Sequence, residues 1–123
     1  MAALATILVV LVALLHGYFL VLEMFLWRTP SGRRTFGTDE AFADRSAALA
    51  ANQGLYNGFL AAGLLWGAVA ADPVGFQVRV FFLACVIVAG VYGAATVNRR
   101  ILAVQAAPAA IALIVVLVAN ASA

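Results

Sequence analysis

The chain has little charge and almost no sulfur. Charged residues make up 10% of its 123 residues, and it contains one cysteine and one histidine. Soluble domains carry about 25% charged residues, so a chain that is 67% hydrophobic needs lipid around it. One cysteine excludes a disulfide scaffold, and the low polarity excludes a disordered tail. A net charge of only +2 argues against a nucleic-acid-binding protein.

The same shortages limit the chemistry. All seven basic residues are arginines, so the chain has no lysine for a Schiff base. His16, as the single histidine, excludes haem ligation by two histidines of this chain. No set of His, Cys, Asp and Glu has the spacing of a metal site, and no glycine-rich phosphate loop is present. Cys85 lies among valine, isoleucine and alanine, which is typical of packing. We therefore expect no metal and no cofactor.

Long apolar stretches predict an all-α integral membrane protein. A bilayer core about 30 Å thick needs about 20 apolar residues in a helix, and the backbone in lipid must satisfy its own hydrogen bonds. The sequence predicts a four-helix bundle in a single transmembrane domain over residues 1–123. Its helices are expected at about 2–27, 39–71 with an interfacial start, 79–97 and 101–119. The first stretch lacks a basic start and a cleavage site, so it is predicted to be a retained helix.

Local signals define the connections. Residues 28–34 contain a proline and a glycine, which predicts a turn. Thr38 is followed by two acids, Asp39 and Glu40, which predicts that Thr38 caps the second helix. Pro108 is predicted to kink the fourth helix, because proline removes a backbone donor.

The placement of arginine predicts the orientation. Basic residues favour the cytoplasmic side of a membrane. Six of the seven lie in the first and third connections, at Arg28, Arg33, Arg34, Arg45, Arg99 and Arg100. Arg79 alone lies in the second connection. The first and third connections are therefore expected on the cytoplasmic side and both termini outside.

Polar side chains within the predicted spans mark a candidate ligand-binding site. With a rise of about 1.5 Å per residue, most of them fall in the cytoplasmic half, with His16 near the midplane. The candidates are Glu23, His16, Asn52, Gln53, Tyr56, Asn57, Tyr92 and Gln105. A charged carboxylate in a membrane costs several kcal/mol, so Glu23 must be neutral, paired or in contact with water.

Glu23 and His16 are also the candidate catalytic or proton-carrying residues. They are seven residues apart on one helix face, and a water or a bound solute could bridge them. Asn52, Gln53, Tyr56 and Asn57 are expected to form one broad polar face. The alternative is that these polar groups form interhelical hydrogen bonds. The Gly54–Gly58 and Gly63–Gly67 pairs are predicted to serve helix packing.

Several of these residues carry a family resemblance. The chain resembles the small bacterial membrane proteins catalogued as domain of unknown function number thirteen hundred and four. The resemblance is carried by His16-x-Tyr18, Glu23-Met24-Phe25-x-Trp27, the run from Ala51 to Leu64, Ala89-Gly90-x-Tyr92-Gly93 and Gln105-x-x-Pro108-Ala109. It implies four helices, an inner-membrane location and no established activity, and it supplies no catalytic residues.

Three functions remain open at this point. The first is binding or transport of a small polar solute, coupled to protons, by a homo-oligomer. The second is a membrane enzyme that uses acid–base chemistry of the isomerase type on a lipid-soluble substrate. The third is an accessory subunit of a membrane complex. The expected partners are the lipid bilayer and other membrane subunits, with no nucleic acid.

Overall fold

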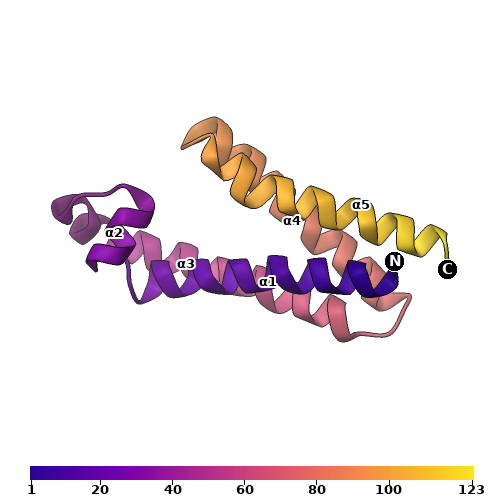
Figure 1. Ribbon diagram of the computed structural model, residues 1–123. Coiled ribbons are helices and arrows are strands. Elements are labelled where there is room, and N and C mark those ends of the chain that lie inside the picture. Colours follow the sequence, from indigo (N-terminus) through magenta and orange to yellow (C-terminus); the bar gives the residue numbers. More distant parts are fainter. The chain divides into compact units, whose positions relative to one another are not determined.

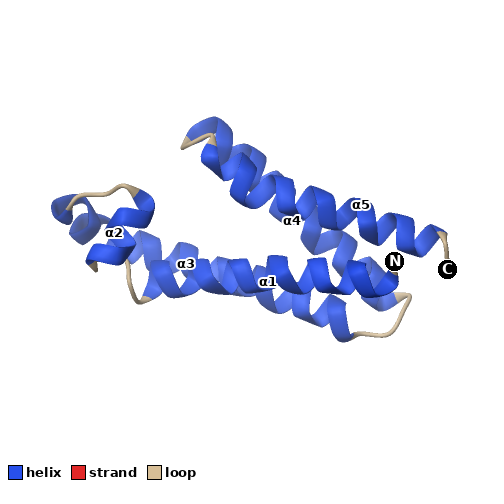
Figure 2. Cartoon of the chain, in the orientation of Figure 1, coloured by secondary structure: helices blue, strands red, loops and turns tan.

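The computed structural model describes residues 1–123, and the chain is all-α with no strand. It contains five α-helices and one short π-helical segment, η1 (Figures 1 and 2). They are α1 (Ala2–Met24), α2 (Pro30–Phe36), α3 (Glu40–Val69), α4 (Val74–Thr96), η1 (Leu102–Ala106) and α5 (Ala107–Ala121). The all-α prediction is confirmed, but the predicted number of four helices is wrong, because the first connection contains a helix of its own.

That additional helix, α2, replaces the predicted turn. The Thr29 hydroxyl accepts a hydrogen bond from the Gly32 backbone N–H at 3.2 Å, which caps the helix. Pro30 occupies the first helical position, where its missing N–H leaves no bond unmade. Gly37 ends the helix in the left-handed conformation, with φ of 67°. Pro30, one of the two residues that predicted a turn, therefore starts a helix, Gly32 lies within it, and Gly37 ends it.

The start of α3 corrects a second local prediction. The Asp39 carboxylate, at Oδ1, accepts from the Phe42 backbone N–H at 2.7 Å. Asp39 is thus the capping residue, whereas the Thr38 hydroxyl is buried without a hydrogen-bond partner. Both residue types can cap a helix, but a carboxylate also interacts favourably with the positive end of the helix dipole.

The connection between α3 and α4 is shorter than predicted. Helix α4 begins at Val74 rather than near 79, because Asp72 Oδ1 accepts from the Phe76 backbone N–H at 2.9 Å. Arg79 therefore lies inside α4. Its guanidinium donates to the Gly67 carbonyl at 2.9 Å and lies 3.4 Å from the Asp72 carboxylate. One arginine side chain thus ties the end of α3 to the start of α4.

The irregularity predicted at Pro108 takes the form of η1. The Ala107 N–H bonds to the Leu102 carbonyl, five residues earlier, which is the π-helical pattern. Helix α4 approaches this segment closely at Gly90. A Cβ atom at Gly90 would lie 2.7 Å from the backbone nitrogen of Ala106 and 2.8 Å from its Cβ. The contact between α4 and η1 therefore requires glycine.

The helices present large apolar side chains to the outside. On α1 these recur every three or four residues, at Leu4, Ile7, Leu11, Leu14, Tyr18 and Val21, and Phe25 continues the spacing just after the helix; all of them are exposed. Three helices are long and apolar enough to cross a membrane, namely α1, α4 and Leu102–Ala121. Helix α3 is not one of them, and its sequence includes Asn52, Gln53 and Asn57. An apolar outer surface of this kind is suited to lipid.

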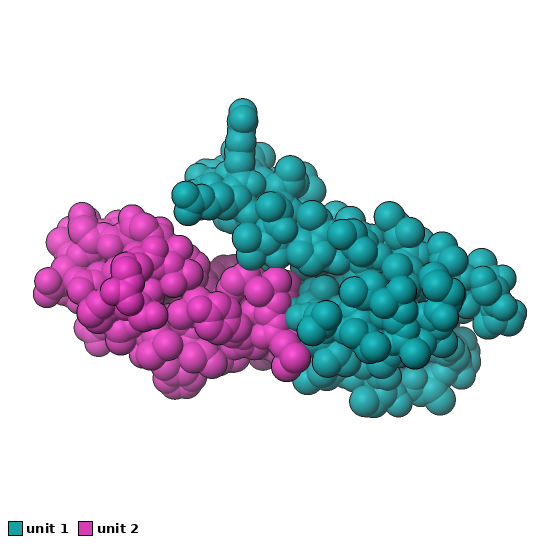
Figure 3. Space-filling view, viewed as in Figure 1, with its two compact units in different colours: residues 1–13, 62–123 teal, residues 14–61 magenta.

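The chain divides into two compact units (Figure 3). Unit 2 is formed by residues 14–61, and unit 1 by residues 1–13 and 62–123. In unit 1, α5 packs alongside α4, and the two termini lie toward the same end (Figure 1). In unit 2, a Cβ at Gly54 would lie 3.1 Å from the Glu23 Cβ, and one at Gly58 would lie 2.6 Å from the Leu20 Cδ1. The Gly54–Gly58 pair therefore serves helix packing, as predicted.

Substituting Gly90 tests the contact between α4 and η1. We expect Gly90→Ala to lower the free energy of unfolding by about 1–3 kcal/mol, because overpacking against backbone atoms forces the helices apart. Thermal unfolding in detergent micelles measures the loss.

Gly17→Ala is the matched control. A Cβ at Gly17 would meet nothing within 4 Å, and alanine favours a helix over glycine by about 1 kcal/mol. We expect this variant to be at least as stable as the parent. Equal stability of the two variants would contradict the close contact.

Candidate functional site

Glu23 and Asn57 form a buried polar pair within unit 2. The Asn57 side-chain amide, at Nδ2, donates to the Glu23 carboxylate, at Oε1, over 2.5 Å. Glu23 is 9% exposed and Asn57 is 5% exposed. The two residues are 34 positions apart in the chain, in the last turn of α1 and in α3. The packing of α1 against α3 therefore brings the Asn57 amide to Glu23, which is the one acid in the first predicted membrane span.

Small residues on α3 allow this pairing. Ala43, Ala50, Gly54 and Asn57 are all buried. They are spaced by seven, four and three residues, which places them on one face of the helix. At Gly54 the nearest atoms of α1 belong to Leu20, Glu23 and Met24. Because glycine has no side chain, α3 can approach α1 next to Glu23, and Asn57 follows less than one turn later.

A cavity of about 560 Å³ borders Glu23, the acid of the pair. Its wall includes the last turn of α1, the turn that follows and the first half of α3. The lining residues are Glu23, Met24, Phe25, Trp27, Arg28, Thr29, Ala47 and Ala48. All of them belong to unit 2. The volume falls within the range of about 300–1,000 Å³ that is typical of small-molecule sites.

Trp27 is a fixed part of this wall. Its indole N–H donates to the Ser46 hydroxyl at 3.0 Å. The Ser46 hydroxyl in turn donates to the Phe42 carbonyl at 2.7 Å. The centroid of the indole lies 4.9 Å from that of the Phe36 ring of α2. The orientation of Trp27 is therefore set from α2 and α3 at once.

Arg28 is held much less firmly. Its guanidinium lies 4.0 Å from the Asp44 carboxylate, and its side chain is 67% exposed. Exposed ion pairs contribute only about 0–1 kcal/mol. Sequence reasoning used Arg28 only to predict orientation, and it did not place Arg28 or Trp27 in the site. Trp27 and Arg28 follow Glu23 by four and five residues, just beyond the end of α1. This closeness in sequence could have identified them as neighbours of the acid.

The predicted polar face of α3 is divided in the structure. Asn57 is buried against α1, whereas Asn52, Gln53 and Tyr56 are exposed. The Asn52 amide donates to the Ala48 carbonyl of its own helix at 2.9 Å. These four residues therefore differ in burial, and their common role in binding a ligand stays a prediction. Residues 52, 53 and 56 differ from 57 in direction around the helix, and the packed stripe passes through 54 and 57.

His16 is fully buried in α1. Its ring lies edge-on to Phe19, with centroids 5.4 Å apart. It precedes Glu23 by seven residues on the same helix. Burial of this kind fits a histidine held in place by packing within the helix pair, and a role in carrying protons stays a prediction.

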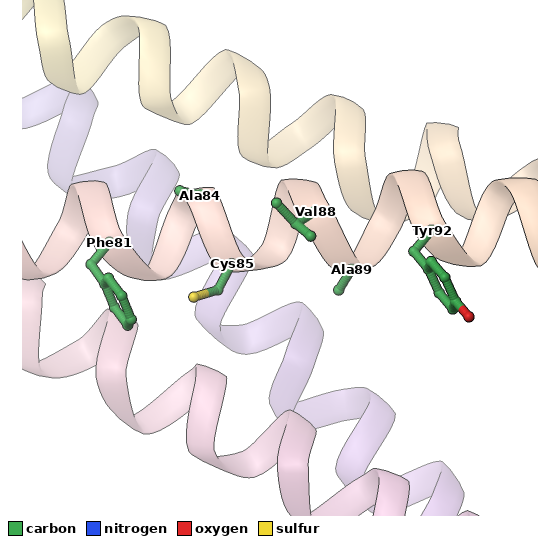
Figure 4. Close-up of a pocket in the computed structure, with 6 residues that line it drawn as sticks. All are labelled: Phe81, Ala84, Cys85, Val88, Ala89 and Tyr92. Atoms are coloured by element: carbon green, nitrogen blue, oxygen red, sulfur yellow. The ribbon is translucent and has the colours of Figure 1, made fainter.

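Tyr92 and Gln105 belong to unit 1. Tyr92 is 71% exposed and borders a groove on the surface of α4. Figure 4 shows this groove, whose lining of Phe81, Ala84, Cys85, Val88, Ala89 and Tyr92 is almost wholly apolar. Gln105 lies in η1 and is partly exposed. No group of three or more His, Cys, Asp or Glu side chains comes together as metal ligands would.

Three helices are long and apolar enough to cross a membrane, and a buried acid–amide pair lies beside a cavity, which are the features of a membrane protein with a candidate polar site. The family described as "Protein of unknown function (DUF1304)" matches residues 10–117, and the chain belongs to this family. The resemblance drawn from the sequence motifs is therefore confirmed. The match includes both Glu23 and Asn57.

One relative covers nearly the whole chain. The uncharacterized protein YpaA of Lactococcus lactis subsp. lactis (strain IL1403) is 33% identical over 116 residues, which are 93% of this chain and 97% of the relative. No solved structure matches the chain.

Removing the amide tests the energetic role of the pair. We expect Asn57→Ala to lower the free energy of unfolding by about 1–3 kcal/mol, because it leaves a buried carboxyl without its donor. Asn52→Ala is the matched control, since that amide is exposed and bonds within its own helix. Denaturation in mixed micelles measures both variants, and equal losses would refute the assignment.

Proposed function

We propose that the protein is a multi-pass inner-membrane protein that binds a small polar solute beside Glu23 and takes part in its transport, coupled to a proton on Glu23. The observation that carries the proposal is the buried Glu23–Asn57 hydrogen bond on the wall of a ligand-sized cavity. A carboxyl in a membrane-spanning helix is expensive, and such groups typically serve solute or proton pathways.

The cavity supports this function over a purely structural one. An interhelical hydrogen bond that only stabilises packing needs no space beside it. Here Glu23 both accepts from Asn57 and lines the cavity. A group so placed can bind a solute without losing its structural partner.

The proposed topology has four spans, with α3 as the fourth beside the three apolar helices. Helix α3 has 30 residues, which is long enough to cross with an interfacial start. The two termini lie toward the same end of unit 1, which favours an even number of crossings. Five of the seven arginines lie between α1 and α3 or between α4 and η1, and Arg45 follows close by in the second turn of α3, which favours both termini outside.

Transport also implies an assembly. Four short helices leave little room for a solute pathway within one copy, so we propose that several copies, or a partner subunit, surround it. The exposed apolar stripes of α1 and α5 are available for lipid or for such neighbours.

A ligand screen tests the proposal. We expect at least one small polar solute to raise the thermal stability of the protein in detergent, because a ligand at a hundred times its Kd adds about 2.7 kcal/mol. Glu23→Gln should lose this stabilisation. Glu40→Gln should keep it, because Glu40 is exposed and lies outside the cavity lining.

Uptake of the same solute into liposomes then separates transport from binding alone. An inward proton gradient should accelerate uptake by the parent protein but not by Glu23→Gln. If no solute stabilises the parent more than it stabilises Glu23→Gln, the proposed site does not exist.

Reporter fusions test the orientation. A periplasm-active phosphatase fused to either terminus should be active, and one inserted after Gly37 should be inactive. A cytoplasm-active fluorescent protein should give the opposite pattern. An active phosphatase after Gly37 would exclude the proposed topology.

A further inference from the structure

We infer that the cavity beside Glu23 binds a zwitterion that carries a primary ammonium group and a phosphate or carboxylate group a few atoms apart. The inference rests on the proposed function, because it names the ligand class of the same site. It follows from two opposite charges that line one cavity without pairing with each other.

Glu23 supplies the negative side. Asn57 donates to Oε1, which leaves Oε2 as the oxygen that a ligand can engage. The residue is 9% exposed and lines the cavity. A charge-assisted hydrogen bond from an ammonium group to a carboxylate is about twice as strong as one between neutral groups.

Arg28 supplies the positive side. It lines the same cavity, and its only ion pair is the exposed contact of 4.0 Å with Asp44. A guanidinium presents paired N–H donors that match the oxygens of phosphate or carboxylate. Because the Asp44 contact is weak, Arg28 can turn toward an anion at little cost.

The two charges do not neutralise each other. The ion pairs of the structure are Arg28–Asp44, Arg33–Glu40 and Arg79–Asp72, and Glu23 takes part in none of them. A purely anionic ligand would meet the Glu23 carboxylate, and a purely cationic ligand would meet the Arg28 guanidinium. A zwitterion complements both groups at once.

The other side chains that line the cavity suit a ligand whose ammonium group is attached to an apolar segment. The face of an indole attracts cations, and the ring of Trp27 is held in place by Ser46 and Phe36. Met24 and Phe25 add apolar surface. The chemistry is that of an ethanolamine phosphate, which can come from a phospholipid headgroup or from a free solute.

Trp27 provides a direct readout. The chain has two tryptophans, and the other, Trp66, is 54% exposed and outside the cavity lining. In a Trp66→Phe background, fluorescence therefore reports on Trp27 alone. The probes, added in detergent, are dihexanoyl phosphatidylethanolamine, free phosphoethanolamine, dihexanoyl phosphatidylglycerol without an ammonium group, and ethanolamine without an anion.

We expect saturable binding of a probe that carries both charges, at least about tenfold tighter than of the two probes with one charge, a difference of about 1.4 kcal/mol. Glu23→Gln and Arg28→Gln should each weaken it about tenfold or more. Arg28→Lys should restore part of the loss. Arg45→Gln, which removes an exposed arginine outside the cavity lining, should change binding less than about twofold.

Saturation by the lipid alone assigns the ligand to a headgroup, and saturation by free phosphoethanolamine assigns it to a soluble zwitterion. Equal binding of phosphatidylglycerol or ethanolamine, no saturable binding, or unchanged affinity in Arg28→Gln would overturn the inference. Arg28 is exposed, so this variant tests the inference even if Glu23→Gln fails to fold. A Glu23-dependent solute without both charges would refute the zwitterion while leaving the proposed function intact.

Discussion

The close approach of α1 and α3 at Gly54 is the contact on which the candidate site depends. Because Gly54 has no side chain, the backbone of α3 passes next to Leu20 and Glu23 of α1. Asn57, three residues further along the same face, then reaches the carboxyl of Glu23. A larger side chain at Gly54 would separate the helices and leave the acid buried without its donor, which is far costlier than a lost contact between apolar groups.

Lipid as the surrounding solvent explains why the helices are organised in this way. On α1 many of the large apolar residues are exposed, whereas His16 and Glu23 are buried. In water the exposed apolar side chains would be unfavourable. In lipid their burial brings no hydrophobic gain, because the lipid chains are themselves apolar. Close packing of small residues and interhelical hydrogen bonds stabilise the helix pair instead. Glycine and the few polar groups therefore determine which helix faces meet.

Helix ends show how far local sequence signals extend. Composition and apolar length predicted the all-α fold and the approximate positions of the apolar helices, because these depend on the cost of exposing backbone groups to lipid. The signals at Pro30 and Gly32 were ambiguous, since proline and glycine serve both turns and helix ends. Only the hydrogen bonds of Thr29 and Asp39 decided where α2 and α3 begin. Neither bond can be read from residue types alone.

The sequence by itself determined that the protein needs a membrane, that its family is DUF1304, and that Glu23 and Asn57 are polar residues in unusual places. Tertiary structure decided which polar groups meet. It paired Asn57 rather than Asn52 with Glu23, and it placed Trp27 and Arg28 around the same cavity. The physical reason for this division is that a residue's depth in the membrane and its direction around a helix follow from its position in the chain. Contact between α1 and α3 follows from how the two helices are rotated about their axes, which the small residues of α3 allow.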